Sequence, residues 1–260
     1  MMKSETIFSG RRAAPWLLGA LLILRFPLLI LGGTWAAAVA VYLVGTQLCT
    51  ALLFWTLRDR LDRCFVTLPA LALFLLSPLF AWQGGMDDFT VWLRALVCAA
   101  LAWGLWRRRA EVRLAHSRGF VKNLLLTAVL VAAAALLFAW VRGFKGGGEV
   151  PTAESVWRGL CFQLSFAAVM EEPLFRAFLP ALLESRGLRP AAAVLACAAI
   201  FWLGHVYYIG TGANFWVVIP LASLLLGLVA CRTGSMAWSM GAHACLNALG
   251  DIFQHSLRLF

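Results

Sequence analysis

The chain has 260 residues, of which 62% are apolar and 13% are charged, whereas a soluble domain has about 45–50% apolar and about 25% charged residues. These values exclude an ordinary cytosolic globular protein and predict an all-α, polytopic helix bundle, because a membrane-spanning helix needs roughly 20 apolar residues. The 22 Lys and Arg against 12 Asp and Glu give a formal charge of +10, but the cations lie in short clusters between apolar runs. This arrangement is typical of membrane topology and not of a nucleic-acid-binding face.

Apolar segments bounded by charged, glycine or turn residues predict the spanning helices. In chain order they cover residues 13–31, 34–57, 65–82, 91–106, 120–141, 159–183, 190–208, 215–230 and 236–253. We predict eight or nine transmembrane helices, because only Gly32 and Gly33 separate the first two segments and the last has a short apolar core. The first segment follows Lys3, Arg11 and Arg12 without a convincing cleavage site, so it is interpreted as an uncleaved span.

Cations between these segments predict the orientation of the chain. One cluster lies at 58–63 and a second at 107–122, whereas the loop at 83–88 has no cation. Because cation-rich loops stay in the cytoplasm, nine spans with a cytoplasmic N-terminus place both clusters inside. The same side then receives a further set of cations, Arg186, Arg189 and Arg232. The loop pattern is typical of a multi-pass protein of the bacterial inner (cytoplasmic) membrane.

The segment 142–158 divides the chain. It contains three consecutive glycines, but no strand precedes it and no Lys-Ser/Thr pair follows, so it is interpreted as a flexible loop and not as a phosphate-binding loop. Before it, residues 1–141 are N-terminal transmembrane helices of unassigned role. After it, residues 159–260 contain nearly every ionisable group at membrane depth. The seven cysteines have no CxxC or zinc-finger spacing, which favours small buried side chains within the helices.

Two adjacent carboxylates, Glu171 and Glu172, lie in the middle of the segment 159–183. A charge at this depth costs about 2.5–3.5 kcal/mol on insertion scales and is normally paired, exposed to a cavity, or functional. Arg176 follows Glu172 at the i,i+4 spacing, so the two can form an ion pair, whereas Glu171 is turned away by about 100°. We expect Glu172 and Arg176 to be structural support and Glu171 to be the chemical group. Pro173 is expected to free a backbone carbonyl and kink this helix.

Two later segments each place an imidazole at membrane depth. Phe201 and His205 share one face of the segment 190–208, and His243 and Asn247 share one face of the last segment. A single intramembrane histidine is often only a packing residue, but three helices that each offer an acid, an imidazole or an amide indicate a common site. The other two histidines, His116 and His255, lie in charged or terminal segments and are interpreted as solvated.

These side chains suit the hydrolysis of a peptide bond. A carboxylate can act as general base on water, an imidazole can orient that water, and an imidazole and a carboxamide can donate hydrogen bonds to an oxyanion. The same residue types could instead hold a zinc ion, although no HExxH motif is present. Intramembrane Glu, His and Arg also occur in transporters, but no inverted repeat is visible in the sequence.

The ordered set Glu171-Glu172-x-x-x-Arg176, Phe201-x-x-x-His205 and His243-x-x-x-Asn247 resembles the CPBP family, the intramembrane glutamic endopeptidases related to CAAX proteases and to the bacteriocin-processing and immunity "Abi" proteins. The resemblance covers roughly residues 155–253. It implies that Glu171 activates water, that Glu172 and Arg176 support it, and that His205 orients the water. It further implies that His243 and Asn247 form the oxyanion site and that no cofactor or metal is needed.

The expected partners are the lipid bilayer and a membrane-anchored or hydrophobic peptide or protein substrate, and no nucleic acid. The prenylated substrates of eukaryotic relatives are not transferred to this chain, because its loops are of bacterial type. An exported protein with a hydrophobic C-terminal anchor and a bacteriocin leader both remain open as substrates. The alternative class is a non-catalytic immunity or scaffold protein that binds a peptide in the same cavity.

Overall fold

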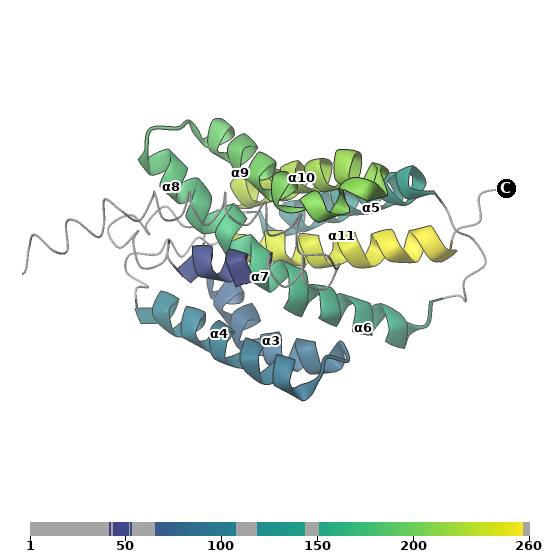
Figure 1. Ribbon diagram of the computed structural model, residues 1–260, viewed down its shortest axis with the longest axis horizontal. Helices are drawn as coiled ribbons and strands as arrows, with labels where there is room; N and C mark the ends of the chain where they lie inside the picture. Colours follow the sequence, from purple (N-terminus) through teal and green to yellow (C-terminus); the bar gives the residue numbers. More distant parts are fainter. Residues whose placement is uncertain are drawn as a thin grey trace, which may run out of the picture.

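The computed structural model describes residues 42, 44–51, 53, 66–107, 119–143 and 151–256. Every regular element in these ranges is helical (Figure 1), in agreement with the predicted all-α class. The predicted segment 13–31, most of 34–57, the cation cluster at 58–63 and His116 lie outside the described residues.

The first complete elements form an antiparallel hairpin. Helix α3 (Leu68–Gln83) and helix α4 (Asp88–Arg107) pack along each other and are joined by a tight turn at Gly84 and Gly85. Asp87 caps α4, because its carboxylate accepts hydrogen bonds from the backbone N–H and the hydroxyl of Thr90 at 2.8 and 2.7 Å. The predicted segments 65–82 and 91–106 agree with these helices to within a few residues.

A second group contains α5 (Phe120–Arg142), α10 (Ile219–Thr233) and α11 (Met236–Ser256). A π-helical segment, η5 (Asn214–Val218), leads directly into α10. Helix α11 packs along α5 and against α10, and it lies near the centre of the bundle (Figure 1). The buried contact between them is made by apolar side chains, Val131, Ala135, Phe138, Val218, Leu226, Val229, Ala242 and Leu246.

Between these groups runs a long helical stretch of five consecutive elements. In chain order they are α6 (Ala153–Gln163), the π-helical η2 (Leu164–Ala168), α7 (Val169–Glu172), the π-helical η3 (Pro173–Phe178) and α8 (Leu179–Ser185). Each π-helical segment holds one residue more per turn than an α-helix. The stretch therefore continues through Pro173 with a widened turn at the place where the sequence predicted a kink.

The start of this stretch corrects one prediction. The loop predicted over 142–158 extends too far, because α6 already begins at Ala153. The Thr152 hydroxyl accepts a hydrogen bond from the backbone N–H of Ser155 at 3.1 Å and so caps the helix. The apolar pattern of the sequence does not indicate the first turns of α6, because these residues are amphipathic and mostly exposed.

Helix α9 (Pro190–Gly204) ends directly before His205. A 3₁₀ segment, η4 (Val206–Thr211), follows it, and His205 lies at the junction between the two. The predicted segment 190–208 therefore contains a helix and the start of a tight connection. The indole N–H of Trp202 donates to the carbonyl of Phe215 at 2.7 Å, which ties the end of α9 to the start of α10.

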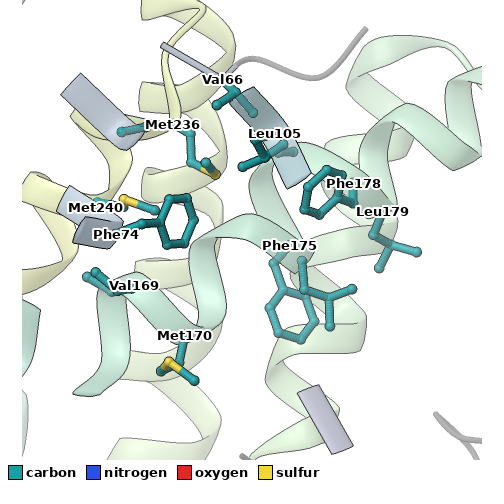
Figure 2. Packing of buried hydrophobic residues seen from close by; sticks show 14 of the residues in the cluster. Val66, Phe74, Leu105, Val169, Met170, Phe175, Phe178, Leu179, Met236 and Met240 are labelled. Carbon is teal, nitrogen blue, oxygen red and sulfur yellow. The ribbon is translucent and has the colours of Figure 1, made fainter. Parts of the chain in front are cut away.

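The main apolar core surrounds α7 and η3. Figure 2 shows Phe74 of α3 beside Met236 and Met240 of α11, and Leu105 of α4 beside Phe178 of η3. Burying a large apolar side chain contributes about 1.5–3 kcal/mol. Contacts from three directions therefore hold the segment that contains the two glutamates.

Three described helical runs are long and apolar enough to cross a membrane, Asp88–Arg107, Phe120–Arg142 and Asn214–Thr233. Leu68–Gln83 and Pro190–Gly204 are apolar but shorter. Large apolar side chains point outward from these helices, among them Trp92 and Leu96, each 70% exposed. An apolar exterior of this kind suits lipid contact. The predicted number of eight or nine transmembrane helices stays a prediction.

Candidate active site

The two glutamates lie on the single α-helical turn between the π-helical segments. Glu171 is 4% exposed and Glu172 is fully buried. Because they are adjacent on a helix, their side chains leave the axis in directions about 100° apart. The two carboxylates therefore meet different partners.

Glu172 lies at the centre of a polar cluster. One carboxylate oxygen, Oε1, lies 2.8 Å from Nδ1 of His243. The other, Oε2, accepts a hydrogen bond from the Ser239 hydroxyl and forms an ion pair with Arg176, whose Nε lies 3.5 Å away. Both oxygens of this buried carboxylate are thus engaged by donors, as a buried charge requires.

Arg176 has further neighbours beyond Glu172. Its Nη2 donates to the Ser223 hydroxyl at 3.4 Å, and its guanidinium carbon lies 4.6 Å from the centre of the Phe201 ring. The ion pair predicted from the i,i+4 spacing is therefore present and is enclosed by α9 and α10.

Glu171 faces the two histidines that the sequence singled out. Nε2 of His205 lies 3.6 Å from Oε1 of Glu171, and Nε2 of His243 lies 3.7 Å from Oε2. Both distances exceed a direct hydrogen bond, for which about 2.7–3.2 Å is usual. The sequence left Glu171 without a partner because neither histidine is close to it in the chain.

Backbone and carboxylate contacts orient both imidazoles. Nδ1 of His205 lies 2.8 Å from the carbonyl oxygen of Phe201, one turn earlier in α9. A carbonyl can only accept, so this nitrogen carries the proton and Nε2 is directed at Glu171. His243 is oriented in the same way, with Nδ1 on Glu172 and Nε2 on Glu171. His243 thus lies between the two glutamates.

Asn247 lies one turn beyond His243 on α11. Its amide Nδ2 donates to Oε1 of Gln163 at 3.0 Å, and the side chain is partly buried. A carboxamide has two N–H donors, so this contact leaves the second one for another acceptor. Gln163, at the end of α6, was not singled out from the sequence.

Aromatic rings surround His205. The three tyrosines of the chain, Tyr42, Tyr207 and Tyr208, have ring centres 4.5, 5.7 and 6.1 Å from the centre of the imidazole ring. Phe201 adds a fourth ring at 4.4 Å. The histidine is 8% exposed as a result.

Sequence reasoning missed Tyr42 and Ser239. Ser239 had a usable signal, because it precedes His243 by four residues and therefore shares its helix face. Tyr42 had no local signal, since it lies more than a hundred residues before the motifs. The side chain of His255 lies outside the described residues. Among the described side chains, no group of three or more His, Cys, Asp and Glu residues is spaced to hold a metal ion.

Comparison with known proteins identifies one related family. Residues 152–249 match the family described as type II CAAX prenyl endopeptidase Rce1-like. This range agrees with the resemblance predicted over 155–253, and it contains all six predicted site residues, Glu171, Glu172, Arg176, His205, His243 and Asn247. No curated protein and no solved structure matches the chain.

Proposed function

Because residues 152–249 match the Rce1-like family of CAAX prenyl endopeptidases, we propose that the protein is an intramembrane endopeptidase in which Glu171 activates the hydrolytic water. The observation that supports this proposal is the convergence of two imidazole nitrogens on the two oxygens of Glu171, at 3.6 and 3.7 Å. Gaps of this size are too long for direct hydrogen bonds and suit a bridging water.

The reaction begins with a water held between Glu171 and Nε2 of His205. Glu171 takes a proton from the water while the water oxygen attacks the carbonyl carbon of the peptide, which gives a tetrahedral oxyanion. The C–N bond then breaks, and the proton on Glu171 passes to the leaving amine. The products are a new carboxyl end and a new amino end, so atoms and protons balance.

The oxyanion is received by His243 and Asn247. His243 donates from Nδ1 to Glu172, which directs the Nε2 edge of its ring toward the oxyanion. The Asn247 amide proton that is not used by Gln163 is the second donor. Removal of one preorganised donor of this kind lowers kcat by a factor of about 10²–10³. Glu172 and Arg176 hold His243 in place.

The position of the site favours substrates whose polar part lies outside the cytoplasm. The segment that follows His205 leads to Asn214, at the end of the bundle where Arg142 donates to Asn214 and pairs with Asp251. The helix ends on the opposite side of the bundle (Figure 1) carry five of the described cations, Arg107 of α4, Lys122 of α5, Arg186 after α8, Arg189 before α9 and Arg232 of α10. Cation-rich ends stay in the cytoplasm. We therefore place the protein in the bacterial cytoplasmic membrane, acting on an exported protein with an apolar anchor or on a membrane-embedded leader peptide.

The direct test compares membranes that contain the wild-type chain with membranes that contain Glu171→Gln, which keeps the shape and removes the base. New N-termini are enriched from both and identified by mass spectrometry. We expect a set of termini that is present with the wild type and absent with Glu171→Gln. Glu154→Gln is the matched control, because this carboxylate lies in the same helical stretch, is exposed, and pairs with the exposed Arg158.

Three results would contradict the proposal. Identical termini with the wild type and Glu171→Gln would leave a non-catalytic peptide-binding protein as the function. Loss of the termini with Glu154→Gln as well would show that the effect is not specific to the site. Cleavage that a chelator stops and added zinc restores would replace the metal-free mechanism by a zinc-dependent one.

A further inference from the structure

Tyr42 belongs to a part of the chain that the family match does not cover. The match spans 152–249, whereas Tyr42 lies directly before the helical residues 44–51. Its side chain is nevertheless only 1% exposed. A tyrosine buried to this degree normally has a partner for its hydroxyl.

Two neighbours fix the position of this tyrosine against the catalytic residues. Its ring centre lies 4.5 Å from that of His205, with an angle of 55° between the planes. The Tyr42 side chain is also one of the groups that act on the carboxylate of Glu171. Tyr42 therefore packs on the imidazole of His205 and lies near the carboxylate that this imidazole faces.

The helix that follows Tyr42 is anchored independently of these contacts. The amide of Gln47 lies 3.8 Å from the sulfur of Met170, the residue next to Glu171. Cys49 and Leu53 are buried in the same apolar core as α7 and η3. The approach of Tyr42 to the site is therefore supported along more than two turns of helix.

We propose that Tyr42 is a positioning residue of the active site, whose phenol donates to the carboxylate of Glu171 while its ring packs on the imidazole of His205. The inference rests on the proposed function and extends it, because the site then needs a residue from the N-terminal part of the chain. A phenol is uncharged at neutral pH and donates to a carboxylate without neutralising it. The bond fixes which lone pairs of Glu171 are turned toward the water.

The hydrogen bond and the ring can be tested separately. Tyr42→Phe removes the hydroxyl and keeps the ring, whereas Tyr42→Leu removes both. Thr50→Val is the matched control, because it removes one buried hydroxyl from the same helix two turns away, where it donates to the carbonyl of Thr46. Kinetics are measured in detergent with a quenched peptide substrate. Its sequence spans one of the cleavage sites that the Glu171-dependent N-termini identify. The melting temperature is measured on the same samples.

A hydrogen bond to a charged group is worth about 1.5–3 kcal/mol, so we expect kcat of Tyr42→Phe to fall about 10- to 100-fold while KM and the melting temperature stay at wild-type values. The bond stabilises the ionised carboxylate. Its loss is therefore expected to move the acidic limb of the pH–activity profile to higher pH. The other titratable and charged groups that act on Glu171, namely His205, His243, Tyr208, Glu172 and Arg176, are unchanged in this variant.

Tyr42→Leu should show the same loss in kcat and a lower melting temperature, and Thr50→Val should keep the wild-type kcat and pH profile. A Tyr42→Phe enzyme with wild-type kcat and an unmoved pH profile would overturn the inference. A loss of activity equal in Tyr42→Phe and Thr50→Val would also overturn it, because helix packing would then be the cause. Glu171→Gln is assayed in parallel. If this variant cleaves the peptide, the proposed function itself has failed; the other outcomes concern Tyr42 alone.

Discussion

Two glutamate–arginine pairs in one helical stretch have the same i,i+4 spacing and opposite surroundings. Glu154 and Arg158 are 3.1 Å apart and more than half exposed. Glu172 and Arg176 are 3.5 Å apart and almost completely buried. The exposed pair is the shorter of the two but contributes less to the free energy of unfolding, because water and salt screen exposed charges. Loss of one partner from the buried pair leaves a charge that water cannot reach.

Arg176→Ala is therefore expected to lower the free energy of unfolding by about 3–5 kcal/mol. Arg158→Ala is its matched control and should change it by no more than about 1 kcal/mol. Unfolding of both variants in detergent, followed by the melting temperature and by yield, measures the difference. Equal stability of the two variants would mean that His243 and Ser239 alone are enough to hold Glu172.

Local spacing explains which contacts could be predicted from the sequence. The pair of Glu172 with Arg176 follows from one helical turn, and the shared face of His243 and Asn247 follows in the same way. The position of His243 between both glutamates does not, because it depends on how α11 packs against α7. Tyr42 depends on packing still farther along the chain, so no pattern near the motifs indicates it.

At the scale of elements, one glycine controls how α3 meets α6. A Cβ atom at Gly84 would lie 2.9 Å from the Cα atom of Phe162, closer than carbon atoms approach in proteins. The backbone of Gly84 has φ −75°, which any residue can adopt. The need for glycine is therefore steric, as at many close helix contacts in membranes.

We expect Gly84→Ala to destabilise the protein by about 1–3 kcal/mol, because a backbone atom and not a flexible side chain must move. Gly159→Ala is the control within α6, where an added Cβ meets no atom within 4 Å. This variant should gain up to about 1 kcal/mol from better helix propensity. Melting temperatures that change in the same direction for both variants would contradict the close contact.

The helices themselves were largely predictable, and their irregularities were not. Apolar segments gave α4, α5, α10 and α11 to within a few residues, because lipid-facing and buried faces are both apolar and the runs end at charges or turns. The π-helical segments η2 and η3 have no signal of this kind. They flank α7, whose Glu171 and Glu172 meet partners that follow α9 and lie on α11.

The whole molecule has two chemically different ends. At one end of the described bundle, the helix ends carry the cations Arg107, Lys122, Arg186, Arg189 and Arg232. Among the described residues at the other end, Arg142 pairs with Asp251 and Arg158 with Glu154, so these cations are matched by carboxylates. This difference determines which end the positive-inside rule places in the cytoplasm.

A membrane-impermeant thiol reagent applied to intact cells tests this orientation. Glu154→Cys is expected to gain label relative to the wild-type chain, because α6 begins at the end where the cations are matched by carboxylates. Arg186→Cys is expected to gain label only after the membrane is opened, because it lies in the cation-rich connection between α8 and α9. The reverse pattern would place His205 toward the cytoplasm and would favour cytoplasmic substrates.

The two π-helical segments make chain length as important as residue identity in the stretch Ala153–Ser185. Each π turn accommodates one residue that a regular helix would use to advance by about 100°. If Leu164–Ala168 formed an ordinary helix with the same number of residues, α7 would be turned relative to α6 by about that angle. Every side chain of the site would still be present, yet Glu171 would point away from both histidines. Homologues that lack this π-helical segment are therefore expected to be one residue shorter between Gln163 and Val169.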